Sequence, residues 1–248
     1  MLSVCGLTKN FAQQLVFSGF DLEVKPNLIA VLLGPSGCGK STFFDVLTGV
    51  VRADGGNIRW QGQEVGHLGG IAAYMHQKDL LLPWFSLVEN SLLPARTAAE
   101  DLKAARSRVD TLFDRLGLGG YQDHYPHQVS GGMRQRCALV RTLMFDRDLV
   151  LLDEPLSALD SITRKSLQSL LLLLQSEFQR TLVMITHDVD EALLLADDLY
   201  LLSVCPMRIV ERVRLGTDKP RRFDDPELLA MKNSIMKKLE ADGDHVQG

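Results

Sequence analysis

Short apolar runs recur along this 248-residue chain and alternate with longer segments of helical character. Residues 28–33 (LIAVLL) carry no polar side chain, which is typical of a strand buried on both faces of a sheet. The alternation within residues 1–33 predicts two or three strands ending in this run. Strand character returns in DLVLLDEP (148–155) and TLVMITHD (181–188), and a helical stretch follows each. This order predicts an α/β fold.

The segments between these runs predict the remaining organisation. A glycine-rich loop leads into a helix from residue 39 to about 48 with Gly49 as its C-cap, and further glycines at 55, 56 and 62 predict a hairpin. Beyond residue 77 the sequence favours helices until about residue 145. The simplest division is a core of residues 1–77 and 146–205, a helical insertion at about 78–145, and a polar, partly loose C-terminal extension at 206–248.

Composition bounds the class of protein. With 46% hydrophobic and 23% charged residues the chain resembles an ordinary soluble globular protein, and its net charge of −4 argues against a dedicated nucleic-acid binder. The four scattered cysteines favour reduced thiols in a cytosolic protein. No signal peptide is evident, and the densest apolar stretch, residues 170–174, is too short to span a bilayer. If the protein works at a membrane, a partner must hold it there.

The strongest motif is GPSGCGKST at residues 34–42, which follows a predicted buried strand and opens a predicted helix. Glycines let the backbone curl so that several N–H groups point at one phosphate chain. Lys40 supplies a positive charge to the β- and γ-phosphates, and the Ser41 hydroxyl is a natural Mg²⁺ ligand. The motif therefore predicts a nucleotide-binding P-loop.

Adjacent carboxylates end the apolar run LVLLDEP at residues 149–155. The strand would deliver Asp153 to its C-terminal edge, where the carboxylate can bind Mg²⁺ through water, and Glu154 could act as general base on the attacking water. Taken alone, the pattern also fits a strand that ends in a solvated acidic turn. Beside a P-loop, it indicates a Walker B element.

Residues 129–136 (VSGGMRQR) form a second candidate anion site, far from the first in sequence. A serine and two glycines stand directly before a run that favours helix, so backbone N–H groups and a helix N-terminus would meet there. One ATP in one chain does not require this second site.

The order of these motifs resembles the nucleotide-binding subunit of ATP-binding cassette (ABC) transporters. The matching elements span residues 1 to about 205 and are GPSGCGKST, Gln77, VSGGMRQR, LVLLDEPLSALD and His187. The resemblance implies a P-loop NTPase core, with a RecA-like mixed sheet and an N-terminal antiparallel β subdomain, plus an inserted helical subdomain. It also implies a head-to-tail dimer in which each ATP lies between the P-loop of one subunit and the SGG segment of the other.

The resemblance assigns roles to individual residues, although by themselves Phe11 and His187 would also fit structural positions. The implied catalytic residues are Lys40, Gln77, Glu154 and His187, and the implied Mg²⁺ ligands are Ser41, Gln77 and Asp153. The implied ATP contacts are Phe11 on adenine, Val16 on ribose, the loop residues Gly34, Pro35, Ser36, Gly37, Cys38, Gly39, Lys40, Ser41 and Thr42, the signature residues Ser130, Gly131 and Gly132, and Asp160 at the dimer interface. His76 matches no family position and is interpreted as polar surface.

Residues 78–90 (KDLLLPWFSLVEN) resemble importer subunits of the nitrate, sulfonate and taurine group, which includes uptake systems for thiamine-pyrimidine precursors. Exposed apolar side chains around Trp84 would form a groove for a permease coupling helix; ordinary packing within the insertion is the alternative. The implied partners are a second ATP-binding subunit, an integral membrane permease and a separate substrate-binding protein. The implied location is the cytoplasmic face of the inner membrane.

Other readings remain open. A soluble ABC ATPase of DNA repair or translation would need a long coiled-coil insertion or a second cassette, an exporter subunit would share the same motifs, and a P-loop kinase would have no use for VSGGMRQR. The transported substrate cannot be read from the chain, because partner proteins would recognise it. The basic segment at residues 208–223 fits a solvated face, a lipid-headgroup contact or a regulatory site.

Overall fold

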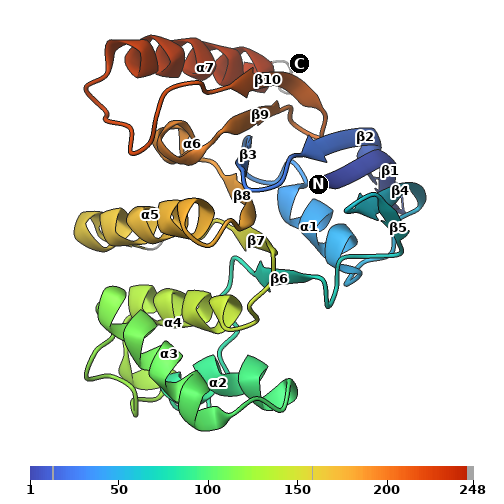
Figure 1. Ribbon diagram of the computed structural model, residues 1–248. Coiled ribbons are helices and arrows are strands. Elements are labelled where there is room, and N and C mark those ends of the chain that lie inside the picture. Colours follow the sequence, from blue (N-terminus) through green and yellow to red (C-terminus); the bar gives the residue numbers. More distant parts are fainter. Residues whose placement is uncertain (13, 158, 245–248) are drawn as a thin grey trace.

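The computed structural model describes residues 1–12, 14–157 and 159–244. Two β-sheets stack around one helix, and a separate group of helices projects from the larger sheet as an arm (Figure 1). This arrangement confirms the expected α/β class with an N-terminal antiparallel sheet and a helical insertion.

The larger sheet has the strand order β10-β9-β3-β8-β7-β6. Its strands are β3 (Ile29–Leu33), β6 (Ala72–Met75), β7 (Leu149–Asp153), β8 (Thr181–Thr186), β9 (Asp198–Leu202) and β10 (Ile209–Arg214). Every residue of β3, β7, β8 and β9 is buried, which is why apolar residues dominate these strands. All neighbours pair in parallel except β9 with β10. Parallel pairing brings the C-terminal ends of β3, β6, β7 and β8 to one edge of the sheet.

The smaller sheet is antiparallel and contains β1 (Leu2–Phe11), β2 (Gln14–Val24), β4 (Gly55–Trp60) and β5 (Gln63–Val65). Helix α1 (Lys40–Thr48) joins it to the larger sheet through a shared apolar core. The rings of Phe17 and Phe20 lie 5.9 and 4.9 Å from that of Phe43, which is fully buried. The helix ends at Gly49 in the left-handed conformation, φ 81°, as the sequence predicted.

The helical arm contains α2 (Leu87–Thr97), α3 (Leu102–Arg115), the short 3₁₀ helix η1 (Pro126–Gln128) and α4 (Gly131–Leu143). A reciprocal pair of bonds between Ser86 and Glu89 caps the start of α2. Asn90, which is fully buried, accepts a bond from the backbone N–H of Leu82 at 2.7 Å and donates to the carbonyls of Leu82 and Phe85. These bonds fix the loop that carries Trp84.

The C-terminal part of the chain contains α5 (Ser161–Ser176), α6 (Val189–Leu195) and α7 (Pro226–Asp244). The expected looseness beyond residue 205 is wrong for much of this part, because β10 extends the larger sheet and Leu228 and Ile235 of α7 join its core. The segment appears polar because an edge strand alternates half-buried and exposed residues. The division of the chain at residue 205 stays a prediction.

Two of the basic side chains in residues 208–223 have structural roles that the sequence did not reveal. Arg221 is buried and donates to the carbonyls of Leu193 and Ala196 at 2.9 and 2.6 Å, which satisfies the C-terminal end of α6. Arg212 lies 3.0 Å from the buried carboxylate of Asp198. The segment is therefore more than a solvated face.

Candidate functional site

The phosphate loop connects β3 to α1 at the C-terminal edge of the sheet. Its backbone needs glycine, since Gly37 and Gly39 have φ of 79° and 112°. A Cβ on Gly39 would lie 2.6 Å from Cγ1 of Val16, so this strand residue packs directly against the loop. Helix α1 begins without a side-chain cap. Its first N–H groups are thus available to an anion.

Lys40 folds back over this loop. The side chain is only 5% exposed, and Nζ donates to the carbonyls of Gly34 and Pro35 at 2.8 and 2.7 Å. The ammonium is therefore held at the loop by bonds that it can exchange for phosphate oxygens. A cavity of about 190 Å³ opens beside it and is lined by Ser36, Gly37, Gly39, Lys40, Ser41, Thr42, Gln77 and Glu154.

Asp153 is the last residue of β7 and is 2% exposed. Burial raises the pKa of this carboxyl to about 6, although the hydrogen bond with Ser41 works in the opposite direction. Within the described part of the chain, Oδ1 of Asp153 is buried and has no hydrogen-bond partner. A buried carboxylate oxygen without a donor, next to a hydroxyl, fits a divalent cation bound directly or through water.

Glu154 follows at the tip of the strand in the left-handed conformation, with φ 49°. Its N–H donates to the carbonyl of Ile185 at 3.0 Å, and its carbonyl accepts from Nε2 of Gln135 at 3.0 Å. Two bonds thus hold a backbone conformation that is costly for a residue with a side chain. The turn directs the carboxylate into the cavity beside the phosphate loop.

The Glu154 carboxylate lies between two predicted site residues. Nε2 of Gln77 donates to Oε2 at 3.2 Å, and Nδ1 of His187 lies 3.2 Å from Oε1. Gln77 follows β6 and His187 follows β8, the strands on either side of β7. The sheet order therefore assembles an amide, a carboxylate and an imidazole beside the phosphate loop. Such a group can orient a water molecule and accept its proton.

The signature residues lie elsewhere. Ser130 caps α4 by accepting a bond from the N–H of Met133 at 3.3 Å, and it is exposed. Figure 1 shows α4 in the helical arm and α1 between the sheets. None of residues 129–136 lines the cavity beside the phosphate loop. Within one chain, the two candidate anion sites are thus not joined.

The other predicted ATP contacts, Phe11 and Asp160, do not line the cavity beside the phosphate loop. Phe11, at the end of β1, is 47% exposed with Nζ of Lys9 4.9 Å from its ring centroid. Asp160 caps α5 by accepting bonds from the N–H groups of Ile162 and Thr163. Ala158, in the same SALD segment, lies outside the described residues. The roles of Phe11, Val16 and Asp160 in binding ATP stay predictions.

Sequence reasoning missed two supporting residues. Gln135 donates to the carbonyl of Glu154 and so holds the turn in place. In the sequence, Gln135 is distinguished by its position in the VSGGMRQR motif. Glu191 is buried and accepts a bond from the Thr186 hydroxyl at 2.8 Å, which supports the turn before His187. Burial raises the pKa of Glu191 to about 7. Its position four residues after His187 is the feature of the sequence that could have identified Glu191.

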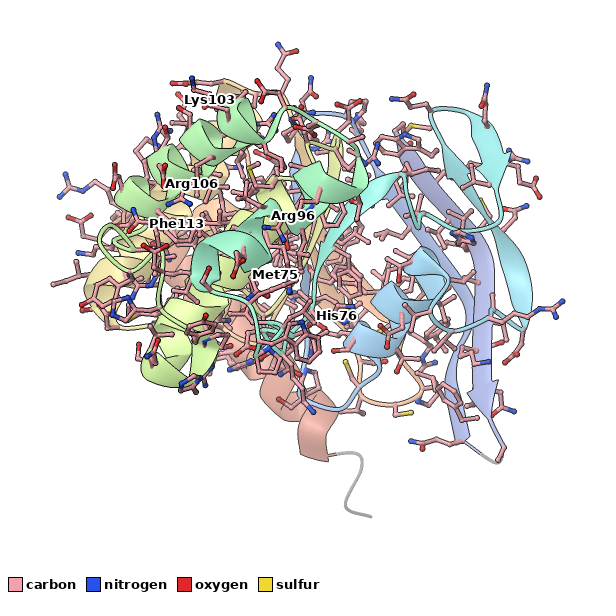
Figure 2. The ribbon with its side chains drawn as sticks, turned by 90° about the horizontal axis from the view of Figure 1, so that it is seen from below. Met75, His76, Arg96, Lys103, Arg106 and Phe113 are labelled. Carbon is pink, nitrogen blue, oxygen red and sulfur yellow. The ribbon has the colours of Figure 1, made fainter. Side chains whose placement is uncertain are left out.

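His76 differs from the expectation of polar surface. Its ring lies against that of Tyr74 with centroids 3.9 Å apart, and burial lowers its pKa. Figure 2 shows it after Met75 at the end of β6, beside α1. His76 thus helps to seat the strand that delivers Gln77.

Among the described residues, no group of three or more His, Cys, Asp or Glu side chains is placed to hold a metal ion. Mg²⁺ usually binds one or two carboxylates together with substrate phosphates and water, so Ser41 and Asp153 are compatible with it. None of the helices in the described segments is long and apolar enough to cross a bilayer.

Comparison with known proteins places these features in a family. The family model described as ABC transporter matches residues 17–157. The chain is 38% identical to the formylaminopyrimidine import ATP-binding protein of Halalkalibacterium halodurans, over 90% of this chain and 87% of that protein. It is 34% identical to a taurine import ATP-binding protein of Yersinia pestis, over 96% and 97%, and 36% identical to an aliphatic sulfonates import ATP-binding protein of Pseudomonas syringae, over 94% and 93%.

Solved structures show the same fold. A dimeric ATP-binding cassette in a post-hydrolysis state, bound to ADP and phosphate, superposes with a TM-score of 0.80 at 23% identity, over 88% of this chain and all of that chain. A protein of Clostridium perfringens that is part of an ABC transporter complex superposes with a TM-score of 0.75 at 22% identity, over 99% and 96%.

Proposed function

The chain belongs to the ABC transporter family, and we propose on this basis that it is the ATP-hydrolysing subunit of an importer. The observation that carries the proposal is the assembly around Glu154: Gln77 and His187 hold its carboxylate in the cavity that Lys40 and Ser41 also line. Glu154 accepts the proton of the attacking water, and Lys40 binds the phosphates.

Ser41 and Asp153 would hold Mg²⁺ at this site, with Gln77 as a further ligand. The bound ion would neutralise charge on the phosphate oxygens. The orphaned Oδ1 of Asp153 and the adjacent Ser41 hydroxyl support this assignment. Because Asp153 is buried, its carboxylate is costly to ionise, and a cation would favour the ionised form.

We further propose that the protein works as a head-to-tail pair. The exposed N-terminus of α4 supplies Ser130, Gly131 and Gly132 to ATP held by the P-loop of the second subunit. This explains why an anion site with its own helix N-terminus lies away from the cavity of its own chain. Asp160, exposed at the start of α5, would lie at the same interface.

A membrane permease is the second partner. Trp84 is 66% exposed, so it is not a core residue of the helical arm, whereas Leu81 and Leu87 beside it are buried. A hollow of about 430 Å³ nearby is lined by Ser86, Val88, Glu89, Leu92, Arg96, Arg106, Asp123 and Tyr125. Figure 2 shows Arg96 on α2 and Arg106 on α3, facing the viewer on the side of the arm seen from below. An exposed tryptophan beside a polar hollow fits the end of a permease helix.

The related importers suggest the class of cargo. Their names specify formylaminopyrimidine, taurine and aliphatic sulfonates, and we propose that this chain powers uptake of a compound from that range. A separate substrate-binding protein would deliver the compound, and the permease would hold the chain at the cytoplasmic face of the membrane. These relatives favour import over export, DNA repair or translation.

Replacing Glu154 by Gln tests the proposal. The amide preserves the shape of the side chain but cannot accept the proton, so ATP should remain bound and hold two subunits together. We expect hydrolysis to be nearly lost and a dimer to appear in light scattering when ATP is added. Wild type without ATP is the control. A variant that stays monomeric at saturating ATP, with and without permease, would refute the paired arrangement.

A further inference from the structure

A second cavity, of about 480 Å³, lies where the helical arm meets the larger sheet. Residues of α3, the end of α4, β6, β7 and α5 line it, together with the turns that follow α4 and α5. It shares no lining residue with the cavity beside the phosphate loop or with the hollow near Trp84. Its size is within the range of pockets that bind small molecules.

The floor of this cavity is apolar. The side chains that form it come from both the arm and the core, and they are Leu112, Leu143, Val150, Leu170, Leu173 and Leu174. Phe178, which is 54% exposed, also lines the cavity. An aliphatic chain bound here would remove apolar surface from water on both sides.

The charged residues that line the cavity are four arginines, Arg108, Arg115, Arg147 and Arg180, and one acid, Asp146. Arg180 already binds Asp146 and Asp148, at 2.5 and 2.7 Å. By contrast, the exposed side chains of Arg115 and Arg147 have no ion pair or hydrogen bond with any residue that the structure describes. Two unpaired arginines and an apolar lining within one cavity match an anionic head on an aliphatic chain.

We infer that this cavity binds a small amphiphilic anion, an aliphatic sulfonate or carboxylate, with its chain on the apolar floor and its head on Arg115 and Arg147. The ligand contacts the C-terminal half of α5 and the end of α4. The opposite ends of these helices carry Asp160 and Ser130, which the proposed function places at the dimer interface. Occupancy therefore fixes the spacing of two helices that serve the second subunit, and it changes the rate of ATP hydrolysis.

Titration calorimetry on the isolated subunit tests binding without requiring hydrolysis. Hexane-1-sulfonate carries both the chain and the charge, ethanesulfonate lacks most of the chain, and 1-hexanol lacks the charge. We expect saturable binding of hexane-1-sulfonate alone. Replacing Arg115 and Arg147 together by Gln should weaken it about tenfold or more, because charge-assisted bonds are lost. The control, Lys103→Gln with Lys165→Gln, removes two charges from α3 and α5 outside the cavity and should leave binding unchanged.

A second variant addresses the cavity itself. Thr111 lies on the exposed side of α3 and lines the cavity, so Thr111→Trp should fill it without disturbing the core. Binding should disappear in this variant. No saturable binding to wild type, or equal binding to wild type and both cavity variants, would overturn the site. Retention on phosphatidylglycerol vesicles that needs both arginines, without binding of free hexane-1-sulfonate, would overturn the assignment of a soluble ligand.

The effect on hydrolysis is measured separately. Saturating hexane-1-sulfonate should change the ATPase rate of wild type and leave that of Thr111→Trp unchanged. An unchanged wild-type rate, with binding confirmed by calorimetry, would overturn the coupling. A protein with no ATPase activity at all would instead count against the proposed function.

Discussion

Replacing Asp153 by Asn should stabilise the ligand-free protein while weakening its response to Mg²⁺ and ATP. The carboxyl has a pKa of 3.8 in an unperturbed setting and about 6 in the fold, chiefly because it is buried. The difference between these two pKa values corresponds to a cost of about 3 kcal/mol at a pH well above 6. An amide carries no such cost, so the variant should melt several degrees higher near neutral pH.

The sign of the pH dependence follows from the same values. Between 3.8 and about 6 the folded protein binds more protons at Asp153 than the unfolded chain does, so its stability falls as pH rises through this window. The advantage of Asp153→Asn over wild type should therefore be small near about pH 4 and largest from about pH 7 upward. Thermal or urea unfolding of both proteins across this range measures the difference.

Two controls make the result specific. Asp218→Asn makes the same chemical change at an exposed residue and controls for the substitution itself. Adding Mg²⁺ and ATP should raise the melting temperature of wild type more than that of Asp153→Asn, since the variant loses a cation ligand. If Asp153→Asn is less stable than wild type at about pH 8, or differs from it equally at all pH values, the argument from burial is wrong.

The remaining predictions concern the nucleotide and the permease. Lys40→Ala should abolish ATP hydrolysis, since backbone N–H groups cannot replace the ammonium on the β- and γ-phosphates. Turnover near the wild-type rate would refute the assignment of residues 34–42 as a P-loop. Trp84→Ala should leave the melting temperature and ATP affinity nearly unchanged, because the side chain is 66% exposed. Association with the permease should weaken by about 2 kcal/mol or more if Trp84 is an interface anchor. A large drop in melting temperature with association retained would contradict that role.

The buried strands could be predicted because burial on both faces leaves a plain apolar signature. Strands β3, β7 and β8 consist mostly of apolar residues, and the segments that follow them carry Lys40, Glu154 and His187. Which strands are neighbours could not be read from any run by itself. The meeting of Gln77 and His187 at Glu154 depends on β7 lying between β6 and β8.

Other features could not be predicted from the sequence, because they depend on contacts between distant segments. Nothing local to Arg221 distinguishes it from the exposed Arg222 beside it, yet only Arg221 reaches the carbonyls of α6. The sequence alone is compatible with Trp84 in the core or at the surface. Its exposure depends on the loop conformation that the hydrogen bonds of Asn90 hold. The sequence favours a surface position for His76, because nothing in the sequence shows that its ring packs against that of Tyr74, two residues earlier.

The paired site is tested most directly by mixing two inactive variants. Lys40→Ala disables the P-loop, and Gly131→Glu places a negative charge where the γ-phosphate should meet the signature segment. A Cβ at Gly131 comes no closer than 3.6 Å to its nearest neighbour, Nη2 of Arg134, so this variant should fold. If each ATP lies between two chains, a mixed dimer has one intact site, and combining the variants with permease should restore hydrolysis that neither shows alone. No recovery in mixtures that form mixed dimers would contradict the account.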